Sequence, residues 1–118
     1  MTILKELLEI LKKFDTVYNN VGKGSNCIVY KHSNLFSNGI IAQDRLEVTV
    51  CNENHATALQ KAEQIKRALV TTGANKKTEH TLEIALNGGG YYFNPDIKSH
   101  CFKAIFSISY KEGIDLNG

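Results

Sequence analysis

The chain has 118 residues, of which 42% are hydrophobic and 22% are charged. This length suits one hydrophobic core, so we expect a single domain spanning residues 1–118. The formal net charge is only +2, with 14 Lys and Arg spread beside 12 Asp and Glu, which argues against direct nucleic-acid readout.

The first 14 residues place apolar side chains at helical spacing, with charged residues between them. This periodicity predicts an amphipathic helix from residue 3 to about 14, with Thr2 as its N-cap. The charges interrupt the segment too often for an export signal or a membrane span, so we expect neither.

Two strands are expected in the first half of the chain. A β-branched and aromatic run at 27–30 predicts the first, and the alternation of apolar and polar residues over 46–50 predicts the second. The segment between them is open to two interpretations. Either Asn38-Gly39 closes a hairpin, or the segment is a loop; in both cases it carries the apolar residues Leu35, Phe36, Ile40 and Ile41.

The second half repeats the pattern of a helix followed by two strands. Asn52 or Asn54 caps a helix that Gly73 ends, and alternating runs over 82–86 and 102–110 predict two further strands. The segment 87–98 between them is expected to be a loop, because it is too long for a tight hairpin. This loop is unusually rich in aromatics: Tyr91, Tyr92 and Phe93.

The predicted fold class is α+β: two helices packed on an antiparallel-rich four-strand sheet, in the order α-β-β-α-β-β. The inward-facing positions of the strands and of the second helix are expected to form one core. Its members are Leu46, Val48, Val50, Leu59, Ile65, Leu82, Ile84, Leu86, Phe106 and Ile108.

None of the polar motifs predicts an active site. Cys51 with His55, and His100 with Cys101, lack the paired-ligand spacing of structural zinc, so no metal is expected. The three cysteines are odd in number and widely spaced, which favours reduced, buried or edge thiols in a cytoplasmic protein. The four histidines, His32, His55, His80 and His100, are expected to be exposed.

The glycine-rich and aromatic segments predict neither a phosphate-binding site nor a nucleic-acid-binding site. Gly22-Lys23-Gly24-Ser25 and Gly88-Gly89-Gly90 do not match a phosphate-binding loop, because neither leads from a buried strand into a helix. The aromatics at 91–93 lack the basic groove of a base-stacking platform. No catalytic residue and no cofactor is therefore expected.

Four features together carry a family resemblance. They are the leading helix, the strand Leu46-Glu47-Val48-Thr49-Val50, the helix bearing Ala58, Ala62, Ile65 and Leu69, and the hairpin from His80 through Gly88–Gly90 and Tyr91–Phe93 to Phe106–Tyr110. In this pattern the chain resembles the small tail-terminator or minor capsid proteins of long-tailed phages and prophages, which belong to the head-tail joining machinery.

The resemblance implies a structural virion protein rather than an enzyme. It implies a ring of identical subunits, commonly a hexamer, at the head-proximal end of the tail, assembled in the cytoplasm of a bacterial host. The implied partners are further copies of the chain, the tail tube protein and the head connector protein, with no membrane. The ring would stop polymerisation of the tube and offer a surface to the head.

The apolar residues of the two predicted loops are the candidate interface. These are Leu35, Phe36, Ile40, Ile41, Tyr91, Tyr92 and Phe93, which exceed what the predicted core can bury and therefore call for a partner. The alternative is a small cytoplasmic ferredoxin-like binding or enzyme subunit that acts as a two-fold dimer.

Overall fold

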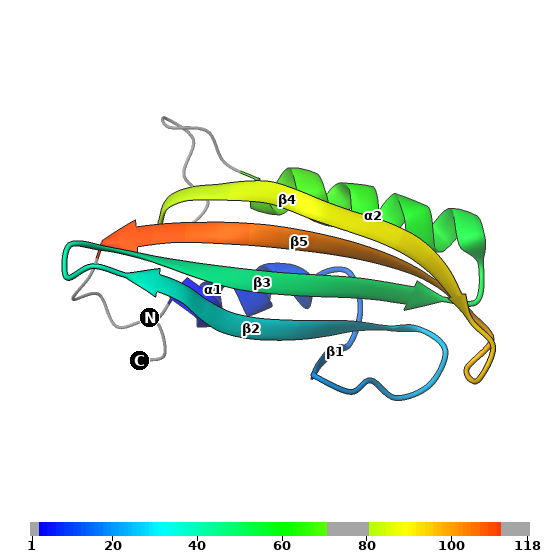
Figure 1. The fold of residues 1–118 in the computed structure, drawn as a ribbon. Helices are drawn as coiled ribbons and strands as arrows, with labels where there is room; N and C mark the ends of the chain where they lie inside the picture. The colour runs from blue at the N-terminus through cyan, green and yellow to red at the C-terminus, as the bar shows by residue number, and fades with distance from the viewer. Residues whose placement is uncertain (1–2, 71–80, 112–118) are drawn as a thin grey trace.

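The computed structural model describes residues 3–70 and 81–111. Two helices, α1 (Ile3–Leu11) and α2 (His55–Leu69), lie on one face of a five-stranded sheet (Figure 1). The strands are β1 (Val17–Asn19), β2 (Cys27–Ser37), β3 (Ile41–Asn52), β4 (Thr81–Asn94) and β5 (Ser99–Lys111). Their order across the sheet is β1-β2-β3-β5-β4, and the molecule is elongated along the strands, with a longest extent of 44 Å.

The expected four-strand sheet is wrong, because the structure has a fifth strand and a mixed sheet. β1 pairs with β2 in parallel, with Val17 opposite Ile28, whereas the other neighbouring strands are antiparallel. The chain leaves α1 at Leu11 and reaches the edge of β2 within a few residues, where Ile28 N donates to Thr16 O at 2.8 Å. A three-residue strand is too short to show an alternation of its own.

The hairpin interpretation of the segment after 31 is confirmed. β2 continues to Ser37, and a turn at Asn38–Ile40 leads into β3. The side chain of Asn38 closes this turn, since its Oδ1 accepts hydrogen bonds from the backbone N–H groups of Ile40 and Ile41 at 2.9 and 2.8 Å. Gly39 has φ 89°, a conformation that favours glycine.

The expected loop at 87–98 is wrong over most of its length. β4 runs through to Asn94, and its residues from Gly88 to Asn94 pair with β5 from Ile105 to Ser99. Only residues 95–98 form the turn. Glycine runs are more usual in loops than in strands, but here Gly89 lies too close to the β5 backbone to carry a side chain.

Most of the predicted core is confirmed. Both helices and the facing sides of β3, β4 and β5 bury one cluster, which contains the predicted Leu46, Val48, Val50, Ile65, Ile84, Phe106 and Ile108. The assignment of Leu59 and Leu86 to the core is wrong, because these residues are 41% and 42% exposed. Leu59 lies beside the buried stripe of α2, and Leu86 lies on β4, whereas α2 packs on β3 and β5. The side chain of Leu82 lies outside the described residues.

The helix ends differ partly from expectation. α1 stops at Leu11 and is followed by a turn, and α2 is capped by Asn54, one of the two predicted caps, whose Oδ1 accepts from Thr57 N at 2.9 Å. Thr2 and Gly73 lie outside the described residues. None of the helices in the ranges 3–70 and 81–111 is long and apolar enough to cross a membrane.

Candidate functional site

The tip of the β2–β3 hairpin exposes an apolar group that we call the hairpin patch: Leu35, Phe36, Ile40 and Ile41. Their side chains are 39% to 73% exposed. Leu35 sits where the pairing of β2 with β3 shifts register, between Asn34 and Phe36. The hairpin reaches one end of the long axis of the molecule (Figure 1). These four residues therefore lie at one end of the sheet and do not belong to the buried core.

The second half of β4 exposes three consecutive aromatics. Tyr91, Tyr92 and Phe93 are 44% to 48% exposed. Because successive side chains of a strand point to opposite faces, Tyr91 and Phe93 share the helix-covered face and Tyr92 lies on the other. We call Tyr91 and Phe93 the aromatic patch.

The aromatic patch is held in place by rings beside the start of α2. Tyr91 lies 4.9 Å from Phe102 and 5.3 Å from His55, measured between ring centroids, and its hydroxyl oxygen lies 2.7 Å from His100 Nδ1. Phe93 packs edge-on against His100 at 5.1 Å. Each aromatic thus has one side packed and one side exposed, which fits a fixed contact surface.

The structure separates the predicted interface residues into two ends. Ser37 pairs with Ala42 of β3 at the hairpin end, whereas Phe93 pairs with His100, which in turn pairs with Asn52 at the other end of β3. From Ala42 to Asn52 the strand advances about 33 Å, from the usual rise per strand residue. All seven predicted residues are exposed, but the interface role itself stays a prediction.

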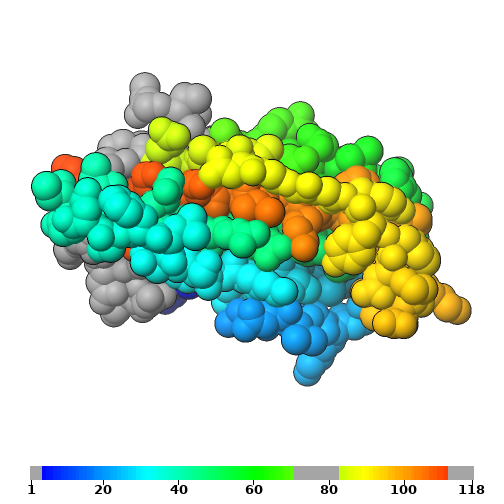
Figure 2. Space-filling view, viewed as in Figure 1, coloured from blue at the N-terminus to red at the C-terminus, as the bar shows by residue number. Residues whose placement is uncertain are grey.

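Sequence reasoning missed a hollow on the sheet face opposite the helices. It measures ≈ 400 Å³ and lies between the β1–β2 loop and the β4–β5 turn, with strand residues as its floor. Figure 2 shows this face, with the loop in blue and the turn in orange. Glu47 and Lys103 line it as an ion pair at 2.8 Å, and this contact holds the pKa of Glu47 below its usual range.

Two members of a row of three thiols, Cys27 and Cys51, line the hollow. Cys27 of β2, Cys51 of β3 and Cys101 of β5 are direct partners across the three adjacent strands, and all are buried, as expected. The Sγ atoms of Cys51 and Cys101 lie 3.4 Å apart. Burial raises the pKa of the thiols of Cys27 and Cys51.

Tyr92 continues this row onto β4, where it pairs with Cys101. Burial and the neighbouring Cys101 raise the pKa of Tyr92 to about 12. The residue as a whole is 44% exposed. Within the described residues, no group of three or more His, Cys, Asp and Glu side chains has the arrangement of a metal site.

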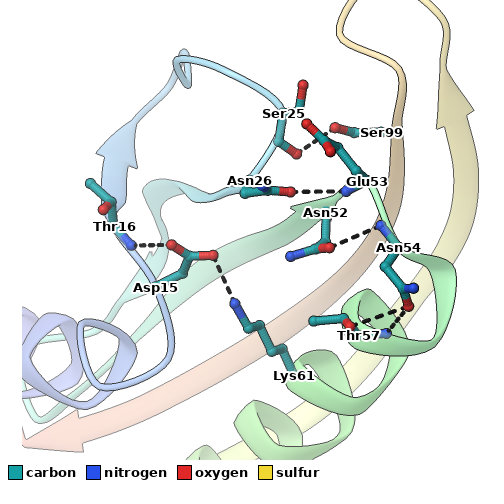
Figure 3. A network of polar contacts seen from close by, with 10 residues as sticks. All are labelled: Asp15, Thr16, Ser25, Asn26, Asn52, Glu53, Asn54, Thr57, Lys61 and Ser99. Carbon is teal, nitrogen blue, oxygen red and sulfur yellow. Dashed lines mark hydrogen bonds and ion pairs between the residues drawn. The ribbon is translucent and has the colours of Figure 1, made fainter.

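A polar network fixes the β1–β2 loop, which leads into Cys27 (Figure 3). Ser99 Oγ donates to the carbonyl of Ser25, and Ser25 Oγ donates to Ile97 O at 2.6 Å. Asn26 Oδ1 accepts from Glu53 N at 2.9 Å, which ties the same loop to the start of α2. These bonds join segments that are far apart in sequence, so no local sequence motif predicts them.

The histidines are less exposed than expected. His55 is exposed, but His32 and His100 are half-buried, and His80 lies outside the described residues. His32 Nε2 lies 2.5 Å from Oδ2 of the buried Asp44, and the other carboxylate oxygen of Asp44 accepts from Asn34 Nδ2 at 2.8 Å and from Tyr110 OH at 3.1 Å. The sequence analysis did not identify Asp44 as a buried residue. Its position, two and four residues before the inward-facing Leu46 and Val48, places it on the same face of β3.

Comparisons with known proteins give a fold likeness alone. No protein-family model matches the chain, and no curated protein matches its sequence. Among solved structures, the fold is similar to that of a chain in the virion of a native gene transfer agent particle, with a TM-score of 0.58 over 92% of this chain and 91% of that one. The two sequences are 12% identical, so the likeness shows a shared fold.

Proposed function

We propose that the chain is a structural subunit of a phage-like virion, and that its copies form a ring that ends the tail tube and joins it to the head connector. The placement of the two apolar patches at opposite ends of the subunit carries this proposal. The fold likeness to a chain of a gene transfer agent virion supports its coarser part, that the chain is a virion protein.

Two different patches at opposite ends suit head-to-tail contacts. In such a contact the hairpin patch of one subunit packs against the aromatic patch of the next, and the series closes into a ring if the rotation per subunit allows it. A two-fold dimer that packs one patch against its own copy would leave the other patch exposed. Exposed apolar groups at both ends favour the ring.

The chemistry of the contact is favourable on both sides. The aromatic patch offers rings held by neighbouring rings, so little conformational freedom is lost when a partner covers them. The hairpin patch offers branched and aromatic side chains on a paired, rigid hairpin. Aromatic residues are enriched at the centres of protein interfaces.

The test uses phage tail tubes assembled without a terminator. Wild-type protein is expected to bind tube ends and to hold the tubes at fixed length in electron micrographs. Phe36→Asp and Tyr91→Ala/Phe93→Ala are expected to abolish this capping. Val21→Asp is the matched control, because Val21 is 78% exposed and lies outside both patches.

Each outcome bears on a different part of the proposal. Tubes that keep growing with wild-type protein present would exclude a terminator. Capping that survives both patch substitutions would exclude the contact between the two patches. Loss of capping with Val21→Asp would show that the assay reports general damage to the protein.

A further inference from the structure

We propose that the thiol row is an oxidation site, at which Cys51 is cross-linked either to Cys101 or to Cys27 and so staples neighbouring strands together. The inference rests on the register of three strands and on the contact between two sulfur atoms. It stands independently of the proposed virion role.

The pair Cys51 and Cys101 already has the spacing of a disulfide. The two residues are direct partners in an antiparallel pair, where Cα atoms lie about 4.5 to 5.5 Å apart, within the range that a disulfide spans. Their Sγ atoms are 3.4 Å apart, so rotation of the side chains, without a shift of the backbone, brings them to bonding distance.

Cys27 competes for the same sulfur. It is the direct partner of Cys51 on the other side of β3, and the three cysteines pack as one cluster. Cys27 and Cys101 are two strand spacings apart, about 9.5 Å, which is too far for a disulfide. Only one of the two disulfides can form at a time, and both require Cys51.

A small oxidant has a route to the row. Cys27 and Cys51 line the hollow on the open face, and Cys51 is the more exposed of the two, at 5% against 1%, so a molecule the size of hydrogen peroxide that enters between the loop and the turn meets Cys51 first. The peroxide oxidises one thiol to a sulfenic acid and releases water. A neighbouring thiol then attacks the sulfenic sulfur, the S–S bond forms and a second water leaves.

The burial of the thiols sets the rate of this reaction. The thiolate is the reactive form, and burial raises the pKa of the thiols of Cys27 and Cys51. The thiols therefore persist in a reducing cell and oxidise slowly outside it. In the proposed virion, which rests on the proposed function, the staple would form after release and fix the end of the sheet next to the aromatic patch.

The experiment treats the purified full chain with hydrogen peroxide and then blocks the remaining thiols with iodoacetamide under denaturing conditions. We expect a mass lower by two hydrogen atoms, one alkylated cysteine, and a peptide map that links Cys51 to Cys101 or to Cys27. The oxidised form should melt about 10 °C higher, because the Cys51–Cys101 link closes a long loop.

Three single substitutions separate the alternatives. Cys27→Ser should still form the Cys51–Cys101 link, Cys101→Ser should form the Cys27–Cys51 link, and Cys51→Ser should form neither. Cys27→Ser and Cys101→Ser change the row equally but keep Cys51, so they are the matched controls. Circular dichroism of each variant shows whether it is folded, and the wild-type peptide map does not depend on any substitution.

A Cys27–Cys101 link, an intramolecular link in Cys51→Ser, oxidation to sulfinic or sulfonic acid without a link, or a folded chain that does not react would each overturn the proposal. Because this test uses the isolated chain, its failure says nothing about the ring. Tube capping measured in a reducing buffer is equally independent of the staple.

Discussion

At the scale of single residues, Asp44 is a buried carboxylate that three side chains hold in place. It is buried on the helix-covered face of the sheet, and its carboxylate contacts His32, Asn34 and Tyr110. A buried carboxylate is stable only when such partners replace water. The network therefore fixes the β2–β3 hairpin to β5 near the hairpin patch.

Asp44→Ala should lower the free energy of unfolding by about 3 kcal/mol, because it removes the buried carboxylate that contacts the half-buried His32 and the buried Tyr110. Urea unfolding measures this change. Asp96→Ala is the matched control, since Asp96 is exposed and should change stability by less than about 0.5 kcal/mol. Equal effects of the two substitutions would contradict the role of the network.

Tyr92 predicts how stability changes at high pH. The pKa of Tyr92 is raised to about 12 in the folded chain, against about 10 for an unperturbed tyrosine. Between these values the unfolded chain loses the proton before the folded chain does. The stabilising contribution is thus complete below about pH 10 and is lost as the pH rises toward 12.

We therefore expect the urea midpoint of wild type to fall between about pH 9.5 and 11.5, and the fall to be shallower in Tyr92→Phe, which has no hydroxyl to ionise. Tyr91→Phe removes a hydroxyl on the other face of the same strand and serves as the control. Identical pH profiles for wild type and Tyr92→Phe would show that Tyr92 does not contribute.

At the scale of elements, clean alternation made the longest parts of β3 and β5 predictable. The two-residue period alone predicts which side chains face the core, and all five of these are buried: Leu46, Val48, Val50, Phe106 and Ile108. β1 was not predictable, because its three residues make sense only beside β2. The second half of β4 was misread because its glycines and aromatics lack alternation in hydropathy, although their backbone pairs regularly with β5.

The candidate site was predictable only in part. The apolar residues of both patches were identified as surplus to the core, and all are exposed. The hollow and the thiol row were not, because they depend on the register between β2, β3 and β5, which brings Cys27, Cys51 and Cys101 side by side. Sequence spacing carries no information about such a register.

Gly89 tests the strand assignment of this segment directly. A Cβ atom at Gly89 would lie 2.3 Å from the carbonyl oxygen of Lys103 in β5, whereas a Cβ atom at Gly90 would have nothing within 4 Å. Gly89→Ala should therefore cost about 1 to 3 kcal/mol of unfolding free energy. Gly90→Ala should be neutral or stabilise the fold by about 0.5 kcal/mol, because it restricts the unfolded chain.

Chemical denaturation of the two alanine variants measures the difference. Both substitutions replace glycine by alanine at neighbouring positions of one strand. The effect of strand propensity on the unfolding free energy is therefore the same in both and cancels when the two variants are compared. Equal stabilities would mean that residues 88–94 do not pair with β5 as described, and the aromatic patch would then lose its fixed geometry.

At the scale of the whole molecule, one sheet face is closed by α1 and α2 (Figure 1), while the ends carry the two patches. The core is complete without either patch, since the exposed side chains lie outside the buried cluster. Assembly is therefore expected to leave the subunit fold unchanged, with interface backbone shifts of about 1 Å or less.

The head-to-tail contact predicts that two defective variants complement each other. Phe36→Asp disrupts the hairpin patch and keeps the aromatic patch, whereas Tyr91→Asp/Phe93→Asp does the reverse. Each alone should stay monomeric, because a buried, unpaired charge lies in every head-to-tail contact that it can make. Mixed together, they retain one intact contact, between the aromatic patch of the first variant and the hairpin patch of the second. The mixture should form one-to-one dimers that cannot grow, seen by native mass spectrometry at high protein concentration. In a two-fold arrangement that packs one patch against its own copy, the variant that keeps this patch would dimerise alone, and mixing would add nothing. Rings formed by either variant alone, or a mixture that stays monomeric where wild type assembles, would refute the head-to-tail contact.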